Sequence, residues 1–303
     1  LSNLFAKKKI NTLILDTRDH IGGNCYDYFH NGVLVHKYGP HYFRTNSKKL
    51  IKYLSEFTEW IPGNYVAKSY VKNDLYDFPI NLNTLEKYFK VKLTPKNVKS
   101  FINSLKENIK KPKNSKEFIL SRVGKEIYEN FYKNYTYKQW GVYPEKLATN
   151  VCGRVPIYFN RKQSYAIEKN NLMPKKGFTK MFKNMLDSKF INIELGVKKD
   201  TYKKYIDMHT LFYTGPIDSY FNYKFGKLGW RSLNFKFETH KKKFYQNFCQ
   251  INFPNNYKFT RKIEYKHVTG QKINKTVISK EYPKDTGDPY YPVPNITNQR
   301  LYK

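Results

Sequence analysis

Arginine is the side chain best suited to hold an anion, and Arg154 and Arg261 are two of the arginines of this sequence. A guanidinium stays charged at any working pH, and its planar fork can donate two parallel hydrogen bonds to a phosphate group. Each arginine taken alone could equally be half of a surface ion pair. The residue types therefore allow a phosphate site without deciding between these two interpretations.

An acidic residue and a glycine turn lie near the N-terminus. Asp16 ends the apolar run 12–16, which is typical of a buried parallel strand, and Gly22 and Gly23 follow it. In a dinucleotide-binding unit, an acid in this position binds the ribose hydroxyls, and glycines let the backbone approach a ligand closely. The chain contains no GxGxxG motif. A cofactor site and a purely structural turn both remain open on this evidence.

Aromatic side chains and a histidine form the remaining candidates. Phe131, Tyr135 and Trp140 are four and five residues apart, which would bring them near one face of a helix. Such a group can pack in a core or stack on a planar ligand. His41 follows Gly39-Pro40, where a lone histidine is more often structural than catalytic. No Ser-His-Asp set and no paired-carboxylate site is evident, so the sequence favours neither of those kinds of catalysis.

Cysteine usage and length limit the class of protein. The three cysteines are widely spaced and form no CxxC, which argues against a disulfide scaffold and a structural zinc site, and we expect no metal. A chain of 303 residues with 40% hydrophobic and 17% aromatic residues can bury a core, so disorder is excluded as its main state. No apolar run approaches the roughly 20 residues of a membrane helix. We expect a cytoplasmic protein.

The formal net charge of +32 would ordinarily indicate nucleic acid or another anionic partner. The lysines, however, are spread along the whole chain, and Asn, Ile, Tyr and Phe are abundant too. This composition is typical of an AT-rich genome, so we favour solvated lysines over a nucleic-acid footprint.

The elements that must position these residues follow a changing pattern along the chain. Helices are predicted at 47–54, 84–89, 98–109, 115–132 and 177–186, with Thr94-Pro95 as the start signal for the helix at 98–109. Strands are predicted at 12–16, 33–36, 190–195 and 210–216, the last one buried. A hairpin is predicted over 65–78 with its turn at Asn73-Asp74, and an antiparallel sheet over 233–282. The order α/β, then α, then β indicates discontinuous domains that share one site.

Several segments, in order and at similar spacing, closely resemble the UDP-galactopyranose mutases, a family of flavoenzymes. The resemblance is carried by Asn64 and by residues 18–24, 36–41, 75–81, 135–141, 153–156, 174–179, 213–218, 259–261 and 290–292. It covers essentially the whole chain. It implies an α/β fold: an incomplete Rossmann-like FAD-binding domain with an inserted helical domain and an antiparallel β-sheet domain.

The resemblance also implies domain limits. The FAD-binding domain would comprise 1–57 and 176–225, and the helical substrate domain 82–150. The sheet domain would comprise 58–81, 151–175 and 226–292, and residues 293–303 would begin the return to the FAD domain.

The activity implied by the resemblance is the interconversion of UDP-galactopyranose and UDP-galactofuranose. In that family reduced flavin attacks the anomeric carbon through N5, with no net redox change. The cofactor would be FAD in its reduced form, with NAD(P)H as reductant. The substrate would be UDP-galactose. We expect no specific nucleic-acid partner and no membrane-spanning segment. A homodimer is one assembly that the family allows.

The resemblance assigns roles to individual residues. The catalytic group would be Arg154, Arg261 and His41. The cofactor would contact Asp16, Arg18, Gly22, Gly23, Asn24, Gly39, His41, Tyr42, Thr214 and Gly215. The substrate would contact Asn64, Phe131, Tyr135, Thr136, Trp140, Arg154, Tyr165, Asn252, Arg261, Tyr290 and Tyr291. Within this set the two arginines would clamp the diphosphate and the aromatic group would hold the uracil.

The chain departs from the family pattern at three places. Arg44 stands where a second histidine is usual, which bears on the tuning of the flavin loop. The phosphate-binding glycine loop would precede Leu1, and a further flavin segment would follow Lys303. We therefore expect a fragment that binds FAD weakly or not at all by itself. The alternative functions are an amine-oxidase-like flavin oxidoreductase, an inactive fragment, and a basic nucleic-acid-binding protein.

Overall fold

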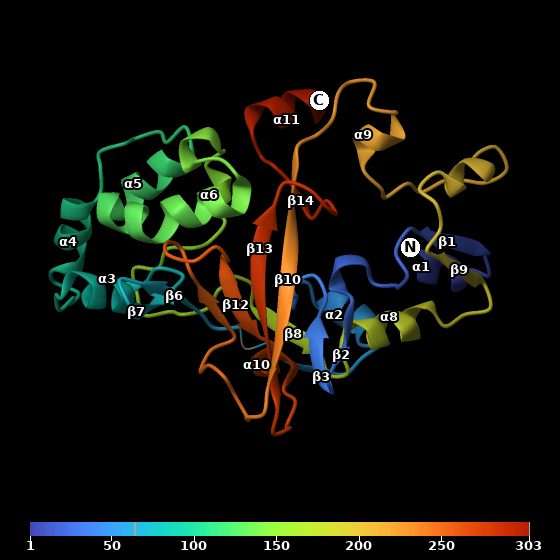
Figure 1. Ribbon diagram of the computed structural model, residues 1–303, viewed down its shortest axis with the longest axis horizontal. Coiled ribbons are helices and arrows are strands. Elements are labelled where there is room, and N and C mark those ends of the chain that lie inside the picture. The colour runs from blue at the N-terminus through green and yellow to red at the C-terminus, as the bar shows by residue number, and fades with distance from the viewer. Residues whose placement is uncertain (64, 303) are drawn as a thin grey trace. The chain divides into compact units, whose positions relative to one another are not determined.

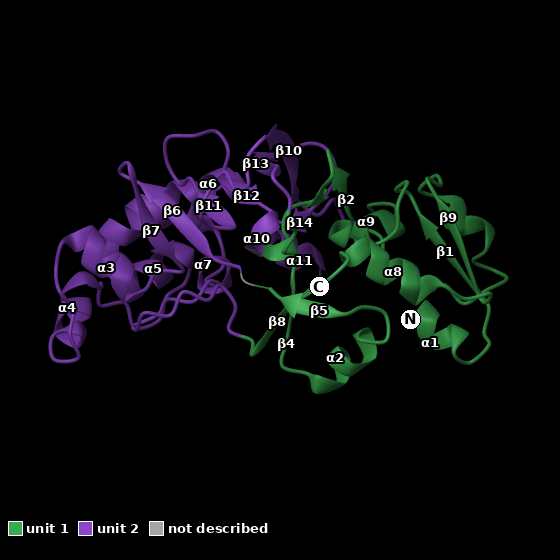
Figure 2. Cartoon of the chain, turned by 90° about the horizontal axis from the view of Figure 1, so that it is seen from below, with its two compact units in different colours: residues 1–63, 168–224, 268–272 green, residues 64–167, 225–267, 273–303 purple. Residues whose placement is uncertain are grey.

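The computed structural model describes residues 1–63 and 65–302 and divides into two compact units (Figure 1). Unit 1 contains residues 1–63, 168–224 and 268–272, and unit 2 contains the described parts of 64–167, 225–267 and 273–303 (Figure 2). Both units are therefore built from separate stretches of the chain. The three-domain division drawn from the sequence stays a prediction.

Unit 1 contains a small parallel sheet. Its strands β1 (Thr12–Asp16) and β9 (Ile191–Leu195) pair in parallel, and Asp16 lies opposite Leu195 at their carboxyl ends. Strands β2 (Asp27–His30) and β3 (Val33–His36) form an antiparallel pair. Strand β8 (Asn170–Pro174) lies between β4 (Phe43–Thr45) and β5 (Trp60–Pro62).

The helices of unit 1 are short. They are α1 (Ser2–Ala6), α2 (Lys48–Leu54), α8 (Phe178–Leu186) and α9 (Ile217–Tyr220), with 3₁₀ turns at Gly23–Cys25 and Thr201–Lys204. Ser47 caps α2 by accepting the N–H of Leu50, which confirms the predicted helix start. Helix α8 begins directly after Gly177, as predicted.

A buried acid fixes the start of α8. The Asp27 carboxylate accepts the backbone N–H groups of Phe178 (2.6 Å) and Thr179 (2.9 Å), two of the donors that a helix N-terminus leaves unpaired. A Cβ at Gly177, whose φ is +85°, would lie 2.5 Å from this carboxylate, so only glycine allows the close approach.

Two local expectations are wrong. Residues 210–216 form no strand and most are exposed, because no other strand of the described chain pairs with them. Thr94-Pro95 does not begin a helix: the N–H of Thr94 binds the Asn97 side chain in a turn, and α4 (Val98–Leu105) starts after it. Strand β1 is parallel as predicted but only partly buried.

Unit 2 is built on a seven-stranded sheet in the order β14-β10-β13-β12-β11-β6-β7. Its strands are β6 (Ala67–Val71), β7 (Asp74–Phe78), β10 (Trp230–His240), β11 (Gln250–Asn252), β12 (Arg261–Glu264), β13 (Thr276–Lys284) and β14 (Tyr291–Pro292). The predicted hairpin and antiparallel sheet are thus present, although the turn of the hairpin lies one residue earlier, at Lys72-Asn73. Strand β11 joins them by pairing in parallel with β6.

The described part of unit 2 also contains six α-helices that lie wholly within it. They are α3 (Leu82–Phe89), α4, α5 (Ser115–Ile127), α6 (Asn134–Trp140), α7 (Asn150–Gly153) and α11 (Ile296–Tyr302), with a 3₁₀ turn at Pro144–Lys146. A π-helical turn, Tyr128–Lys133, joins α5 to α6. The short helix α10 (Lys266–Thr269) contains residues of both units.

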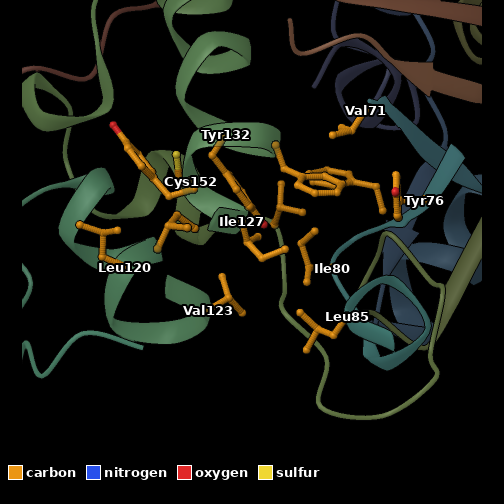
Figure 3. Packing of buried hydrophobic residues seen from close by; sticks show 14 of the residues in the cluster. Val71, Tyr76, Ile80, Leu85, Leu120, Val123, Ile127, Tyr132 and Cys152 are labelled. Carbon is orange, nitrogen blue, oxygen red and sulfur yellow. The ribbon is translucent and has the colours of Figure 1, made fainter. Parts of the chain in front are cut away.

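Figure 3 shows the core of unit 2. Val71 and Tyr76 from the hairpin pack with Ile127 and Tyr132 from the helical region, and Cys152 comes from α7. Gly124 has non-helical backbone angles inside α5, with φ +76° and ψ −177°, and a Cβ there would lie 1.9 Å from the Leu105 carbonyl oxygen. Burial of this apolar cluster is the main stabilising contribution to the unit.

No helix within residues 1–63 and 65–302 has the length and apolar character needed to cross a membrane.

Candidate active site

Unit 1 carries all the residues predicted for the cofactor. The Asp16 carboxylate accepts the backbone N–H of Arg18 (2.9 Å), and the Arg18 guanidinium donates to Asn24 (2.8 Å). The same guanidinium lies 4.4 Å from the centroid of the Tyr38 ring. These contacts hold the turn that contains Gly22 and Gly23, both with positive φ.

His41 lies on a short loop after Gly39. Its backbone N–H donates to Nδ1 of His36 (2.9 Å), and its own Nδ1 is 2.9 Å from the Gly39 carbonyl oxygen. His36 is fully buried, and burial followed by the charge of His41 lowers its pKa to about 3. His36 is therefore neutral and acts as the acceptor that shapes the His41 loop.

Three predicted cofactor residues remain, Tyr42, Thr214 and Gly215. The Tyr42 ring lies 5.7 Å from the guanidinium carbon of Arg44, the residue that replaces the usual second histidine. Thr214 and Gly215 belong to the irregular segment 210–216. The structure therefore brings Asp16, Arg18 and Asn24 into one hydrogen-bonded network. Thr214 and Gly215, in contrast, do not lie at the end of a strand.

A cavity of about 550 Å³ in unit 2 brings three predicted substrate residues together. Trp140, Arg154 and Tyr291 all line it, with Phe118 and Asn150 among their neighbours. The Arg154 guanidinium lies 5.7 Å from the Trp140 ring, and Tyr291 meets that ring edge-on at 5.0 Å. Arg154 is exposed and has no carboxylate partner among the described residues, so its charge is available to a ligand.

Arg261 is surrounded by phenols. Burial alone would lower the pKa of its guanidinium, but the Glu281 carboxylate and nearby tyrosines raise that pKa well above its usual value. The tyrosines are Tyr65, Tyr135 and Tyr165. Burial raises the pKa of Tyr135 to about 12, while the charge of Arg261 opposes the rise. Tyr135 also interacts with the charge of Arg154, so it lies within reach of both arginines.

Glu281 orients Arg261. Its carboxylate is fully buried and accepts the hydrogen bond from Nε of Arg261, whose side chain is 22% exposed. The two terminal NH₂ groups of the guanidinium have no acceptor among the described residues. These are the groups that form a bidentate contact with phosphate oxygens.

Helix α6 presents Tyr135, Thr136 and Trp140. Its last turn is fixed by Arg231 of β10, which is 6% exposed and donates to the carbonyl oxygens of Lys138 and Gln139, both at 3.2 Å. This cation satisfies carbonyls that a helix C-terminus leaves unpaired.

The remaining predicted substrate residues are dispersed. Phe131 is 2% exposed and packs in the core against Tyr76, while Trp140 belongs to a different apolar cluster, because the π-helical turn changes the spacing along the helix. Thr136 and Asn252 are buried, and Asn252 accepts from Gln250 (2.6 Å). The N–H of Tyr290 donates to the Arg231 carbonyl (3.0 Å). Asn64 lies outside the described residues.

Sequence reasoning missed Glu281 and Tyr65 as neighbours of Arg261. Glu281 belongs to β13, where the alternation of side chains along the strand could have indicated an inward position. Only the pairing of β12 with β13 places it opposite Arg261. Tyr65 is 8% exposed and donates to Gln250. No local signal marks this contact, since 185 residues separate the two side chains.

Comparison with known proteins gives the family. A family model described as UDP-galactopyranose mutase matches residues 130–303, and one described as an NAD(P)-binding Rossmann-like domain matches residues 1–57. A probable UDP-galactopyranose mutase of Klebsiella pneumoniae is 33% identical, covering 99% of this chain and 80% of that protein. A dTDP-fucopyranose mutase of Escherichia coli is 32% identical, covering 100% of this chain and 84% of that protein.

The fold agrees with these matches. The crystal structure of a reduced UDP-galactopyranose mutase superposes with a TM-score of 0.71 at 13% identity, covering 99% of this chain and 82% of that one. Together with the Rossmann-like match, this superposition confirms the predicted α/β class. The chain belongs to the UDP-galactopyranose mutase family and is an isomerase.

Proposed function

We propose that this chain interconverts UDP-galactopyranose and UDP-galactofuranose, a ring contraction without net redox change. The observation that carries the proposal is the arrangement at Arg261. Its Nε is held by a buried carboxylate while both terminal NH₂ groups are free of described partners. A guanidinium oriented in this way is suited to a diphosphate, the group that a nucleotide sugar carries.

The proposed roles of unit 2 follow from charge and shape. Arg154 and Arg261 bind the diphosphate and stabilise the negative charge that develops as the bond to the anomeric carbon breaks. Tyr165, Tyr290 and Tyr291 are proposed to reach the phosphates as well. The uracil would be held by α6 through Tyr135, Thr136 and Trp140, with Phe131 supporting them from the core and Asn64 and Asn252 as further contacts.

We propose that unit 1 binds FAD. Asp16 stands at the carboxyl end of a parallel strand, where α/β sheets bind nucleotides, and its carboxylate could accept ribose hydroxyls. The Gly22–Gly23 turn has room for a close ligand at Gly23, where a Cβ would meet nothing nearer than Arg18, at 3.9 Å, whereas a Cβ at Gly22 would lie 3.1 Å from Phe182. When bound and reduced by NAD(P)H, FAD supplies the N5 nucleophile for the anomeric carbon. The other proposed contacts to FAD are Arg18, Asn24, Gly39, His41, Tyr42, Thr214 and Gly215.

Turnover of UDP-galactofuranose by the chain tests the proposal, with a chemical reductant and with FAD in large excess because the sequence predicts weak FAD binding. Arg154→Ala and Arg261→Ala should each lower kcat/KM by at least about a hundredfold, because each removes a charged contact to the leaving group. Arg161→Ala is the matched control, since Arg161 is an exposed arginine paired with Glu86. Full turnover by both active-site variants would refute the assignment of the arginines.

A second candidate is the corresponding ring contraction of dTDP-fucopyranose. It is favoured by the E. coli dTDP-fucopyranose mutase, whose identity to this chain is almost the same as that of the Klebsiella protein. Comparing kcat/KM for the two nucleotide sugars decides between them. An oxidoreductase would instead consume an oxidant in step with substrate, and a nucleic-acid-binding protein would bind with steep salt dependence and without competition from UDP.

A further inference from the structure

The loop between β11 and β12 joins two predicted substrate residues. It begins after Asn252 and ends before Arg261, which lie opposite each other in the β-ladder. At its base the N–H of Phe253 donates to the Thr260 carbonyl (2.8 Å), and the rings of Phe253, Tyr257 and Phe259 pack with centroids 4.9–5.1 Å apart. The position of Arg261 therefore depends on how this loop is held.

One lysine of α6 holds the loop. Lys138 Nζ donates to the carbonyl oxygens of Phe253, Tyr257 (2.9 Å) and Phe259 (3.2 Å). An ammonium has three donors, and here all three are used on backbone acceptors of a single loop. Burial lowers the pKa of Lys138 to about 8. No carboxylate pairs with it among the described residues, so the carbonyls alone compensate its charge.

The lysine thus connects two parts of the proposed nucleotide site. On one side, α6 carries Tyr135, Thr136 and Trp140. On the other, the loop leads directly into Arg261. The same end of α6 is fixed to the sheet by Arg231, which donates to the carbonyl of Lys138 itself. Neither Lys138 nor its carbonyl partners line the cavity that contains Trp140 and Arg154.

We propose that Lys138 is a positioning residue that sets the placement of Arg261 relative to the base-binding helix α6. It acts through the backbone of the loop and contacts no substrate. This inference rests on the proposed function, because it takes α6 as the uracil site and Arg261 as a phosphate ligand.

Replacing Lys138 should shift the loop without unfolding it. Asn255, at the loop's outer part, donates to the carbonyl of Asn130 and accepts from Asn134, both at 3.1 Å, so a second attachment to the helices remains. Lys138→Met removes the ammonium and keeps a side chain of similar length. Lys138→Gln keeps two donors and carries the test if the methionine variant fails to fold.

Lys266 offers a matched control in the same unit. It is 2% exposed, and its Nζ likewise donates to three carbonyls, those of Lys243 (2.6 Å), Ile273 (2.5 Å) and Lys275 (3.1 Å). Arg261 begins β12, whereas Lys266 follows the other end of that strand. Lys266→Met therefore removes the same kind of contact without touching the loop at 253–259.

Calorimetric titration of the full chain with UDP and with uridine tests the proposal without the cofactor. UDP spans both parts of the site, whereas uridine occupies only the base part. We expect Lys138→Met to weaken UDP binding about tenfold to a hundredfold and to change uridine binding less than about twofold, since displacement of a charged ligand group costs affinity of this order. Lys138→Gln should lie between, and Lys266→Met should change neither affinity.

Equal weakening of UDP and uridine by Lys138→Met, or no change in either, would overturn the positioning role. Arg261→Ala separates this failure from that of the proposed function. If Arg261→Ala leaves UDP affinity unchanged, the phosphate site is wrong and the inference falls with it. If Arg261→Ala weakens UDP binding but the Lys138 variants do not, only the inference fails.

Discussion

Arg261 of β12 and Glu281 of β13 are direct cross-strand partners, and the buried carboxylate of Glu281 accepts the Nε hydrogen of Arg261. The bond uses Nε and leaves the two terminal NH₂ groups without an acceptor among the described residues, while Tyr65, Tyr135 and Tyr165 are near enough to act on the charge of the guanidinium. In a surface ion pair both side chains are solvated, whereas here the carboxylate is fully buried and the guanidinium is partly exposed. This arrangement supports the proposed role of Arg261 in binding phosphate.

Removal of Glu281 should therefore affect both stability and binding. Glu281→Ala leaves a largely buried guanidinium without its counter-ion, so we expect the free energy of unfolding to fall by about 3–5 kcal/mol. Denaturant titration measures this loss, and UDP titration measures the accompanying loss of affinity. Glu281→Gln retains an oxygen acceptor and should lose less of both. A Glu281→Ala variant as stable as the parent would contradict the described role.

Arg154 should behave in the opposite way. It is exposed and has no ion pair within the described chain, so Arg154→Ala should change the free energy of unfolding by less than about 0.5 kcal/mol. UDP affinity should nevertheless fall at least about tenfold, because the variant removes the proposed charged contact to phosphate. Thermal melting and UDP titration of the same preparation separate the two effects. Unchanged UDP affinity would remove Arg154 from the site.

Asp77 should make the stability of unit 2 depend on acid pH. Burial opposes its charge, but hydrogen bonds from Lys68, Asn81, Asn83 and Gln163 lower its pKa from 3.8 to about 2. Because the unfolded state binds the proton first, this contribution is present above about pH 4 and is lost as the pH falls through 2. It amounts to roughly 2 kcal/mol.

The comparison of the parent with Asp77→Asn isolates that contribution. We expect the difference in unfolding free energy to be at least about 2 kcal/mol at pH 7 and to shrink as the pH approaches 2. Denaturant titrations at a series of pH values measure it. A difference that stays constant between pH 7 and pH 2 would show that the charge of Asp77 is not the source.

Gly124 should tolerate no side chain. Its φ of +76° and ψ of −177° suit glycine alone, and a Cβ would collide with the Leu105 carbonyl. Gly124→Ala should destabilise the protein by more than about 3 kcal/mol, whereas Gly196→Ala should cost only about 1–2 kcal/mol. Gly196 also has positive φ, but a Cβ there would meet nothing within 4 Å. Equal losses in the two variants would contradict the clash.

Much of the fold and part of the site were predictable from the sequence. The periodicity of apolar residues and the residues at the helix starts indicated α2 after Ser47 and α8 after Gly177, because those signals act over a few residues. The segments 18–24, 153–156 and 259–261 were among those that indicated the family, through residue types and their order. The sequence thus determined the fold class and the family of this isomerase.

Other features were decided only by the tertiary structure. The apolar run 210–216 has the composition of a strand, yet it forms none, since a strand requires a partner and the composition does not supply one. Phe131 shares a spacing pattern with Trp140 but packs in a different cluster, because Phe131 lies in a π-helical turn, which changes the angular step along the helix. Glu281 faces Arg261, and Lys138 reaches three carbonyls, only because distant segments pair in one register. Which side chains are neighbours across a sheet depends on that long-range pairing, and local sequence patterns do not predict it.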